Sequence, residues 1–322
     1  MKKWLKIIKS SVEETTYCGY EKLINGRITT YFENKKVILQ TIKAQDIQDF
    51  YQYLIDNGLS GNTVKHYHSN IRKALQYAVK TDVIISNPAD KVELPKIDPY
   101  NAKHYTSEEV LKLLKIIENT KLETSVILSC FYGLRRSEVV GLKWSAIDFT
   151  NKTILINHTV TQISFNHSNK LVKKDKTKTK SSTRTLPLLP VVENYLLELK
   201  EKQEQNKIIC GNSYNQEYLD YICVDNMGTL LNPDYVSHAF IKLLKKNDLR
   251  IIRFHDLRYT CASLLLAEGI NMKQIQVWLG HSNYNTTANI YAHLDSNSMN
   301  ESANAISNVL STDKIKNVLA TA

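Results

Sequence analysis

Apolar side chains at helical spacing dominate the first hundred residues of the chain. Gly58 and Ser60 separate two predicted helices, because glycine ends helices and serine caps the start of the next one. The first helix carries an apolar stripe at Ile47, Phe50, Tyr51, Leu54 and Ile55, and the second at Val64, Tyr67, Ile71, Leu75 and Ala78. The second helix has an opposite, mostly basic face at Lys65, His66, Ser69, Arg72 and Lys73. This face is either a solvated surface or a surface that follows a phosphate backbone.

Three prolines interrupt the helical pattern before the chain resumes it. Pro88, Pro95 and Pro99 disfavour helix at the residues before them, so this stretch is predicted to be extended. Thr106 and Glu109 then form a capping box that opens the next helix. We therefore expect two domains and a linker, at 1–96, 105–322 and 97–104 respectively.

Strand-like composition appears in two stretches of the second domain, at 153–160 and 183–188. Between them, residues 170–184 hold one acid, Asp175, against the cations Lys170, Lys173, Lys174, Lys176, Lys178, Lys180 and Arg184. We expect a strand, a long basic loop and a returning strand, with helices again from about 191. The predicted fold class is mainly α with a small antiparallel β-sheet, as a helical N-terminal domain and an α+β domain.

Composition narrows the functional classes. The 322-residue chain is 43% hydrophobic and 23% charged, which is typical of a globular protein. No apolar run reaches the roughly 18 residues of a membrane span, and no secretion signal opens the chain. Five scattered cysteines without C-x-x-C argue against a disulfide framework or a zinc site, and favour a reducing, cytoplasmic compartment. The excess of 42 Lys and Arg over 32 Asp and Glu gives a net charge of +10, which fits either a polyanionic partner or a basic protein without a nucleic-acid role.

Two motifs of the second domain have the chemistry to hold a phosphate. Arg135 follows Gly133 after an apolar stretch, and a guanidinium binds a phosphate through two parallel hydrogen bonds. A surface arginine bound to Glu138 is the alternative. His255 and Arg258 lie in the first turn of a predicted helix, where free backbone N–H groups also favour anions. Each motif alone has low specificity.

Read in order, the motifs form a specific pattern. They are G-L-R-x-S-E, a lysine in K-T-K-S-S-T-R-T-L-P, H-D-L-R-Y-T, W-L-G-H-S and I-Y-A-H. In this order and spacing the chain closely resembles the tyrosine recombinase family, which includes the integrases of phages and integrative conjugative elements. The resemblance covers nearly the whole chain, and the first domain resembles the core-binding domain of the family.

The resemblance implies a site-specific recombinase that works through a 3′-phosphotyrosyl intermediate and a Holliday junction, without ATP, cofactor or metal. Arg135 and Arg258 are implied to hold the scissile phosphate in the transition state. Tyr291 is the implied nucleophile. Tyr284 is the weaker candidate because it lacks the Ala-His that follows Tyr291.

Proton transfer is assigned by the same resemblance. Lys180 is the implied general acid for the 5′-oxygen leaving group, with Lys178 as the alternative on the same basic stretch. His255 is implied to assist proton transfer near the nucleophile, and His281 to donate a hydrogen bond to the phosphate. No cluster of Asp and Glu suggests a pair of divalent metals, which disfavours a metal-dependent nuclease.

The implied partner is double-stranded DNA, bound by a homo-tetramer on two recombination sites. The expected DNA contacts are Thr63, Lys65, His66, Arg72 and Lys178. A C-terminal helix at about 302–310 is expected to dock on a neighbouring protomer, and an excisionase or a host DNA-bending protein is the expected accessory partner. The small arm-binding domain of many integrases does not precede residue 1, so arm sites are either unused or the sequence is truncated.

Two other functions fit part of the pattern. A catalytically silent, recombinase-like protein would bind DNA without cutting it. A type IB topoisomerase-like enzyme would share the phosphotyrosine chemistry without strand exchange. Neither the target sequence nor the direction of recombination is readable from one chain, because specificity depends on a few base contacts and on DNA shape.

Overall fold

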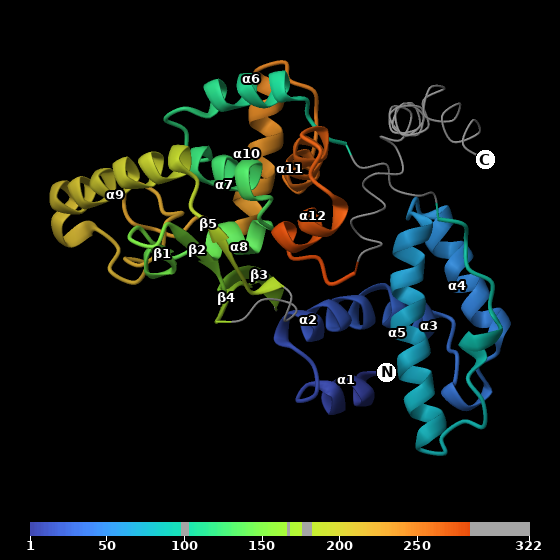
Figure 1. The fold of residues 1–322 in the computed structure, drawn as a ribbon. Helices are drawn as coiled ribbons and strands as arrows, with labels where there is room; N and C mark the ends of the chain where they lie inside the picture. The colour runs from blue at the N-terminus through green and yellow to red at the C-terminus, as the bar shows by residue number, and fades with distance from the viewer. Residues whose placement is uncertain (98–102, 166–167, 176–181, 284–322) are drawn as a thin grey trace, which may run out of the picture. The chain divides into compact units, whose positions relative to one another are not determined.

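The computed structural model of the chain describes residues 1–97, 103–165, 168–175 and 182–283 (Figure 1). The chain divides into two compact units. Residues 1–100 and 163–170 form the first, and residues 101–162 and 171–322 form the second. The predicted fold class is confirmed, because the described elements are mainly helices with small sheets. Within these ranges no helix is both long enough and apolar enough to cross a membrane.

Five helices build the first unit. They are α1 (Lys2–Ile8), α2 (Glu14–Leu23), α3 (Thr29–Asn34), α4 (Ala44–Asp56) and α5 (Gly61–Lys80), with a π-helical turn at Ile24–Ile28 and 3-10 turns at Leu39–Thr41 and Pro88–Lys91. The two predicted helices are confirmed as α4 and α5, and the Ser60 side chain accepts a hydrogen bond from the Thr63 backbone N–H. Their apolar stripes are buried in one core, which leaves the polar face of α5 in solvent.

Helices also make up most of the second unit. They are α6 (Ser107–Ile117), α7 (Glu123–Tyr132), α8 (Arg136–Gly141), α9 (Pro190–Cys210), α10 (Pro233–Lys246), α11 (Asp256–Ala267) and α12 (Met272–Leu279), with 3-10 turns at Trp144–Ala146 and Gly211–Ser213. The predicted capping box is confirmed at the start of α6, where Thr106 and Glu109 bond each other's backbone N–H groups. In Figure 1, α7 lies beside α8 and α11, and α12 lies beside α11.

The described residues also form two small sheets, and the second of them includes residues 163–165 and 168–170 of the first unit. β1 (Ile147–Asp148), β2 (Thr153–Ile156) and β5 (Arg184–Pro187) form an antiparallel sheet in the order β1-β2-β5, and β3 (Thr159–Phe165) pairs with β4 (Ser168–Lys174). Residues 153–160 are therefore not one strand, because the chain leaves the first sheet after β2. The prediction of a continuous basic loop over 170–184 is also wrong. Lys173 pairs with Glu217 and lies 4.5 Å from the ring centroid of Tyr218, so its charge is satisfied within a strand.

Two helices end at glycines that are essential to the geometry of the site. α7 ends at Gly133 and α12 at Gly280, both in the left-handed conformation with φ of 59° and 68°. A Cβ on Gly133 would lie 2.4 Å from Leu279 Cδ2, so the ends of α7 and α12 approach closely here. Glycine alone allows both the backbone conformation and the contact.

Candidate active site

Arg135 lies between the end of α7 and the start of α8, and its side chain contacts three separate parts of the chain. It is the N-cap residue of α8, and its Nη1 donates to Glu138 Oε1 at 2.6 Å and to Ser182 Oγ at 3.2 Å. Its Nη2 donates to the backbone oxygen of Gly280 at 3.0 Å. The side chain is 26% exposed, so Arg135 is not closed off from solvent.

Arg258 lies in the first turn of α11 and is almost completely buried, with 1% exposure. Its Nη1 donates to the Gly133 backbone oxygen and its Nη2 to that of Leu279, each at 2.6 Å. Its Nε donates to His281 Nε2 at 3.1 Å. Burial and the charge of Arg135 lower the pKa of Arg258, while Glu138 acts in the opposite direction.

The two arginines converge on consecutive carbonyl groups at one helix end. Arg258 binds the oxygen of Leu279 and Arg135 binds that of Gly280, at the C-terminus of α12. Helix C-termini have unpaired carbonyls and the negative end of the helix dipole, so they favour cations. Each guanidinium has five N–H groups, and the hydrogen bonds found among the described residues leave two on each arginine for a further acceptor.

Glu138 is the acidic centre of this cluster. Its carboxylate is 2% exposed and accepts from Arg135 Nη1, from the Arg135 backbone N–H at 3.0 Å and from Arg184 Nη2 at 3.3 Å. Burial alone would raise the pKa of Glu138, but the charges of Arg184 and Arg135 outweigh burial and lower it. Two guanidinium groups therefore pair with one carboxylate, and the charge of Arg258 also lowers the pKa of Glu138. The excess positive charge in this buried cluster is suited to an anion.

His281 follows the glycine that ends α12. Burial and the nearby charge of Arg258 lower the pKa of His281 to about 3, so its ring is neutral at physiological pH. Because Arg258 can only donate, His281 Nε2 accepts and the neutral ring carries its hydrogen on Nδ1. The Gln276 side chain donates to the His281 backbone oxygen at 3.0 Å and fixes the backbone of this residue.

His255 is the N-cap residue of α11 and lies at the surface, unlike Arg258. Its ring contacts Tyr259 edge-on, with ring centroids 5.5 Å apart. Desolvation by the surrounding chain and the charges of Arg258 and Arg253 lower the pKa of His255. A neutral, accessible imidazole can accept a proton from a substrate or from a nucleophile.

The sequence prediction brought together four residues that the structure places in one cluster: Arg135, His255, Arg258 and His281. Lys178, Lys180, Tyr284, Tyr291 and the segment 302–310 lie outside the described residues. Among the described His, Cys, Asp and Glu side chains, no group of three or more is placed to hold a metal ion.

The sequence prediction missed Ser182 and Arg184 as parts of the site. Arg184 is 8% exposed and donates to the backbone oxygens of Trp278 at 2.8 Å and Ser182 at 3.0 Å, as well as to Glu138. The sequence around β5 held a signal for the inward position of Arg184. Every second residue is buried here, at 182, 184, 186 and 188, and the apolar Leu186 and Leu188 mark the buried face. This alternation points Arg184 inward rather than toward DNA.

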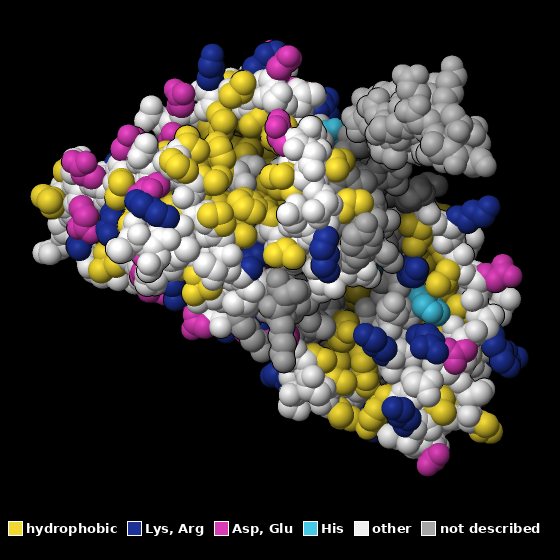
Figure 2. Space-filling view, viewed as in Figure 1, with side chains coloured by type: hydrophobic (Ala, Val, Ile, Leu, Met, Phe, Trp, Pro, Cys, Tyr) yellow, Lys and Arg dark blue, Asp and Glu magenta, His cyan; other side chains and the backbone are white. Residues whose placement is uncertain are grey.

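Four of the five expected DNA contacts lie on α5 of the first unit, namely Thr63, Lys65, His66 and Arg72; the fifth, Lys178, lies outside the described residues. Lys65 and His66 are exposed, and Figure 2 shows Lys and Arg side chains and a histidine gathered over this helix. Arg72 is half exposed and donates to Asp90 Oδ1 at 2.6 Å, so its charge is partly compensated. The Thr63 hydroxyl contacts Ser60 Oγ at 3.0 Å and belongs to the helix cap.

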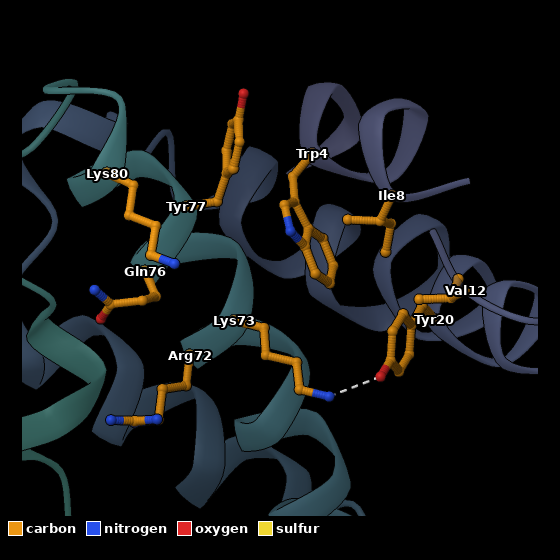
Figure 3. Close-up of a pocket in the computed structure, with 9 residues that line it drawn as sticks. All are labelled: Trp4, Ile8, Val12, Tyr20, Arg72, Lys73, Gln76, Tyr77 and Lys80. Carbon is orange, nitrogen blue, oxygen red and sulfur yellow. Dashed lines mark hydrogen bonds between the residues drawn. The ribbon is translucent and has the colours of Figure 1, made fainter. Parts of the chain in front are cut away.

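A cavity of about 370 Å³ continues this basic face toward α1 and α2 (Figure 3). Trp4, Tyr20 and Tyr77 supply aromatic walls, and the basic side chains that line it are Arg72, Lys73 and Lys80. Lys73 Nζ donates to the Tyr20 hydroxyl at 2.7 Å and lies 5.1 Å from the ring centroid. No acidic residue lines the cavity, so this side of the unit also favours a negatively charged ligand.

Comparison with known proteins identifies both parts of the chain. Residues 103–298 match the model of the phage integrase family, and residues 1–94 match the phage integrase SAM-like domain. The chain is 28% identical over 311 residues to a tyrosine recombinase XerC-like protein of Caldanaerobacter subterraneus, covering 91% of this chain and 78% of the relative. It is also 28% identical over 298 residues to the ICEBs1 integrase of Bacillus subtilis, with the same coverage.

Solved structures share the fold. The Tn1549 transposon integrase in complex with transposon right end DNA superposes with a TM-score of 0.75 at 21% identity, over 94% of this chain and 97% of the other. A lambda integrase tetramer bound to a Holliday junction gives a TM-score of 0.64 at 18% identity, over 90% and 75% of the two chains. At these identities the likeness concerns the fold alone.

Proposed function

The chain belongs to the phage integrase family, and from that premise we propose that it cuts and rejoins DNA at specific sites through a 3′-phosphotyrosyl intermediate and a Holliday junction, without ATP or metal. The family consists of tyrosine recombinases, so the chain is an enzyme of this class. Double-stranded DNA is its proposed partner, and four copies on two sites are the proposed assembly, acting in the cytoplasm. The lambda integrase tetramer on a Holliday junction supports this assembly by its likeness of fold.

The convergence of Arg135 and Arg258 on the end of α12 is the observation that carries the proposal. Arg135 is fixed by Glu138 and one backbone oxygen, and Arg258 by two backbone oxygens, so both need little reorganisation when negative charge develops. Their remaining N–H groups would bind the non-bridging oxygens of the scissile phosphate. His281, which carries its hydrogen on Nδ1, is the third proposed donor.

In the proposed step, the phenolic oxygen of Tyr291 forms a bond to phosphorus while the bond from phosphorus to the 5′-oxygen breaks. His255 assists removal of the phenolic proton, and Lys180 supplies a proton to the departing 5′-oxygen. The phosphotyrosyl bond conserves the energy of the phosphodiester. A second 5′-hydroxyl can then reverse the step and join a new strand without ATP.

Lys180 is preferred over Lys178 because of its covalent distance from Ser182, whose hydroxyl contacts Arg135. Lys180 lies two positions before Ser182, which allows a reach of at most about 7 Å between Cα atoms. Lys178 lies four positions before Ser182, which doubles that reach. The chain therefore ties Lys180 more closely to the arginine cluster, and Lys178 remains the proposed DNA contact.

DNA binding is assigned to both units. We assign residues 1–96 to a core-binding domain, 97–104 to a linker and 105–322 to a catalytic domain, and the two family matches support this division. Lys65, His66 and the α5 face would contact phosphates, with Thr63 and Arg72 at the same surface. The segment 302–310 is proposed to dock on a neighbouring protomer, and an excisionase or a DNA-bending protein is the proposed accessory factor.

Covalent trapping tests the proposal. A nicked duplex from the end of the element that encodes the gene is incubated with protein in EDTA and denatured in SDS. A shifted protein–DNA band that is lost in Tyr291→Phe is expected, while Tyr291→Phe retains DNA binding. Tight binding by the wild type without any covalent band would refute the enzymatic proposal and favour a DNA-binding protein. Cleavage and relaxation of DNA without sequence preference would instead favour a type IB topoisomerase.

A further inference from the structure

A buried tyrosine hydroxyl in the first unit is bonded to a histidine of α5. His68 Nδ1 lies 2.8 Å from the hydroxyl oxygen of Tyr51, a residue of α4 that is 1% exposed. The two rings also meet edge-on, with their centroids 5.8 Å apart and their planes at 74°. A hydrogen bond and a ring contact therefore hold the His68 ring, which loses little conformational entropy when it binds a ligand.

These contacts fix which ring nitrogen carries the hydrogen. Burial lowers the pKa of His68. Of the nearby charges, Arg72 and Lys65 lower this pKa further and Asp90 raises it, so the ring is neutral. Burial also raises the pKa of Tyr51, which keeps its proton. Among the described residues His68 is the one hydrogen-bond partner of this hydroxyl, so Nδ1 accepts and the neutral ring carries its hydrogen on Nε2.

The Nε2–H group faces away from Tyr51 and is open to solvent. The two nitrogens of an imidazole point in nearly opposite directions, and His68 is only partly buried. Nε2 has no hydrogen-bond partner among the described residues, and it is not one of their polar atoms that are buried without a partner. At this position α5 therefore presents a hydrogen-bond donor whose direction is fixed from beneath.

His68 lies between two of the proposed DNA contacts. Lys65 precedes it by three residues and Arg72 follows it by four, a spacing that places all three on one side of α5. The seven-residue step from Lys65 to Arg72 covers about 10 Å of helix axis, and the major groove is about 12 Å wide. If both ends of this face contact phosphates, its middle lies over the base edges.

The surroundings of His68 favour a base edge over a phosphate. Arg72 donates to Asp90 Oδ1 at 2.6 Å, so much of the positive charge beside the ring is compensated. A neutral N–H also gains less from a phosphate than a charged donor does. Base edges, in contrast, are neutral acceptors. A fixed donor distinguishes guanine O6 or N7, adenine N7 and thymine O4 from the N4 amino group of cytosine.

We infer that His68, held by the Tyr51 hydroxyl, is a specificity-determining residue that reads one base of the recombination site by donating from Nε2 to an acceptor in the major groove. Tyr51 acts through His68 and is a positioning residue. The inference rests on the proposed recombinase function and deepens it, because it names one of the side chains that select the site.

Fluorescence anisotropy of the full chain on labelled duplexes tests the inference. The reference duplex is the end of the element that encodes the gene, and further duplexes replace its base pairs one at a time. The wild type should lose affinity about ten-fold where the replacement removes the acceptor that His68 reads.

The variant His68→Ala should bind the reference duplex about ten-fold more weakly than the wild type does. It should bind the reference and that one replaced duplex equally, and keep its discrimination at every other position, which shows that the variant is folded. The slope of log affinity against log salt concentration should not change, because no phosphate contact is lost.

Two tyrosine variants separate positioning from a structural role. Tyr51→Phe keeps the ring and removes the hydroxyl, so it should weaken discrimination at the same position and at no other. Added to His68→Ala, it should cause no further loss of discrimination, because Tyr51 acts through the histidine. The matched control is Tyr53→Phe, which removes a hydroxyl from a 39% exposed residue of the same helix and should behave as wild type.

Three results would overturn the inference. One is a wild-type pattern of affinities in His68→Ala. Another is an equal loss on every duplex, since that loss would come from a phosphate contact, if the salt slope falls, or from a folding defect. Both results leave the proposed recombinase function intact. The third is a wild type that binds all the duplexes equally, which would also refute recombination at specific sites.

Discussion

Replacement of Gly133 by alanine tests how the two helix ends form the arginine site. Gly133 has a φ of 59°, and a left-handed conformation costs an L-residue about 1–2 kcal/mol. The added Cβ would also lie 2.4 Å from Leu279 Cδ2 and 3.4 Å from Cys261 Cβ. Overpacking of a close-packed core costs typically about 1–3 kcal/mol. The sum predicts a loss of about 2–5 kcal/mol in the free energy of unfolding of this unit.

The matched control is Gly269→Ala, which follows α11 in the same unit. Gly269 has a φ of 77°, and an added Cβ there would meet no atom within 4 Å. Only the conformational cost of about 1–2 kcal/mol applies. Urea-induced unfolding of the full chain, followed by circular dichroism, measures both losses. Equal losses for the two variants would refute the claim that the contact with Leu279 matters.

A double variant separates contact from conformation. Leu279→Ala removes the side chain that the new methyl group would strike, so its combination with Gly133→Ala should recover about 1–3 kcal/mol relative to the sum of the single variants. Strict additivity would show that α12 does not limit the space at Gly133. Gly133→Ala should also reduce cleavage, because displacement of Leu279 moves an oxygen that binds Arg258.

Three other predictions concern charge. Glu138→Gln should lower the free energy of unfolding by about 3–5 kcal/mol in urea titrations at pH 7, because it leaves the buried Arg184 and the partly buried Arg135 without their counter-charge. Since the folded-state pKa of Glu138 is lowered, its contribution is complete above the unfolded pKa near 4.5, and the difference between wild type and variant should shrink as pH falls below that value. Because the folded-state pKa of His281 is lowered, its contribution to the free energy of unfolding is complete above pH 6.5 and is lost as the pH falls toward 3. The free energy of unfolding should therefore decline less steeply with falling pH in His281→Gln than in the wild type. Parallel pH profiles of the two proteins would contradict this. Lys65→Ala should reduce the slope of log DNA affinity against log salt concentration, measured by fluorescence anisotropy, by about one, the value of one phosphate contact. The control Lys112→Ala, on the exposed face of α6, should leave this slope unchanged.

Helix boundaries were the most predictable part of the fold, because their signals are local. Ser60, the Thr106–Glu109 capping box and Gly280 each act within four residues of the helix end that they specify. The division into β3 and β4 was not predictable in the same way. β4 pairs with β3, and its Lys173 contacts Glu217 and Tyr218, which lie more than forty positions along the chain. A window of sequence around residue 173 shows only a run of lysines.

The candidate site shows the same limit. Arg135, Arg258, His255 and His281 were predicted because each lies in a motif with recognisable order and spacing. Their hydrogen bonds to the oxygens of Gly133, Leu279 and Gly280 were not predictable, because backbone acceptors leave no residue type to recognise. Glu138 was interpreted as a surface partner of Arg135 or, from the family resemblance, as a support of the local structure. Its second partner, Arg184, comes from a strand forty-six residues away, so the pairing needs the tertiary fold.

The way the arginines are held bears on how the site would bind phosphate. Helix N-termini bind anions directly, through free N–H groups. Here Arg135 and Arg258 themselves lie at helix N-termini, but their side chains bind carbonyl oxygens at the C-terminal ends of α7 and α12, which take up part of each guanidinium and leave the rest for an anion. The free site therefore contains fixed positive charge that Glu138 neutralises only in part, and a phosphate would supply the missing negative charge. Because these bonds already fix both side chains, little conformational entropy would be lost when DNA binds.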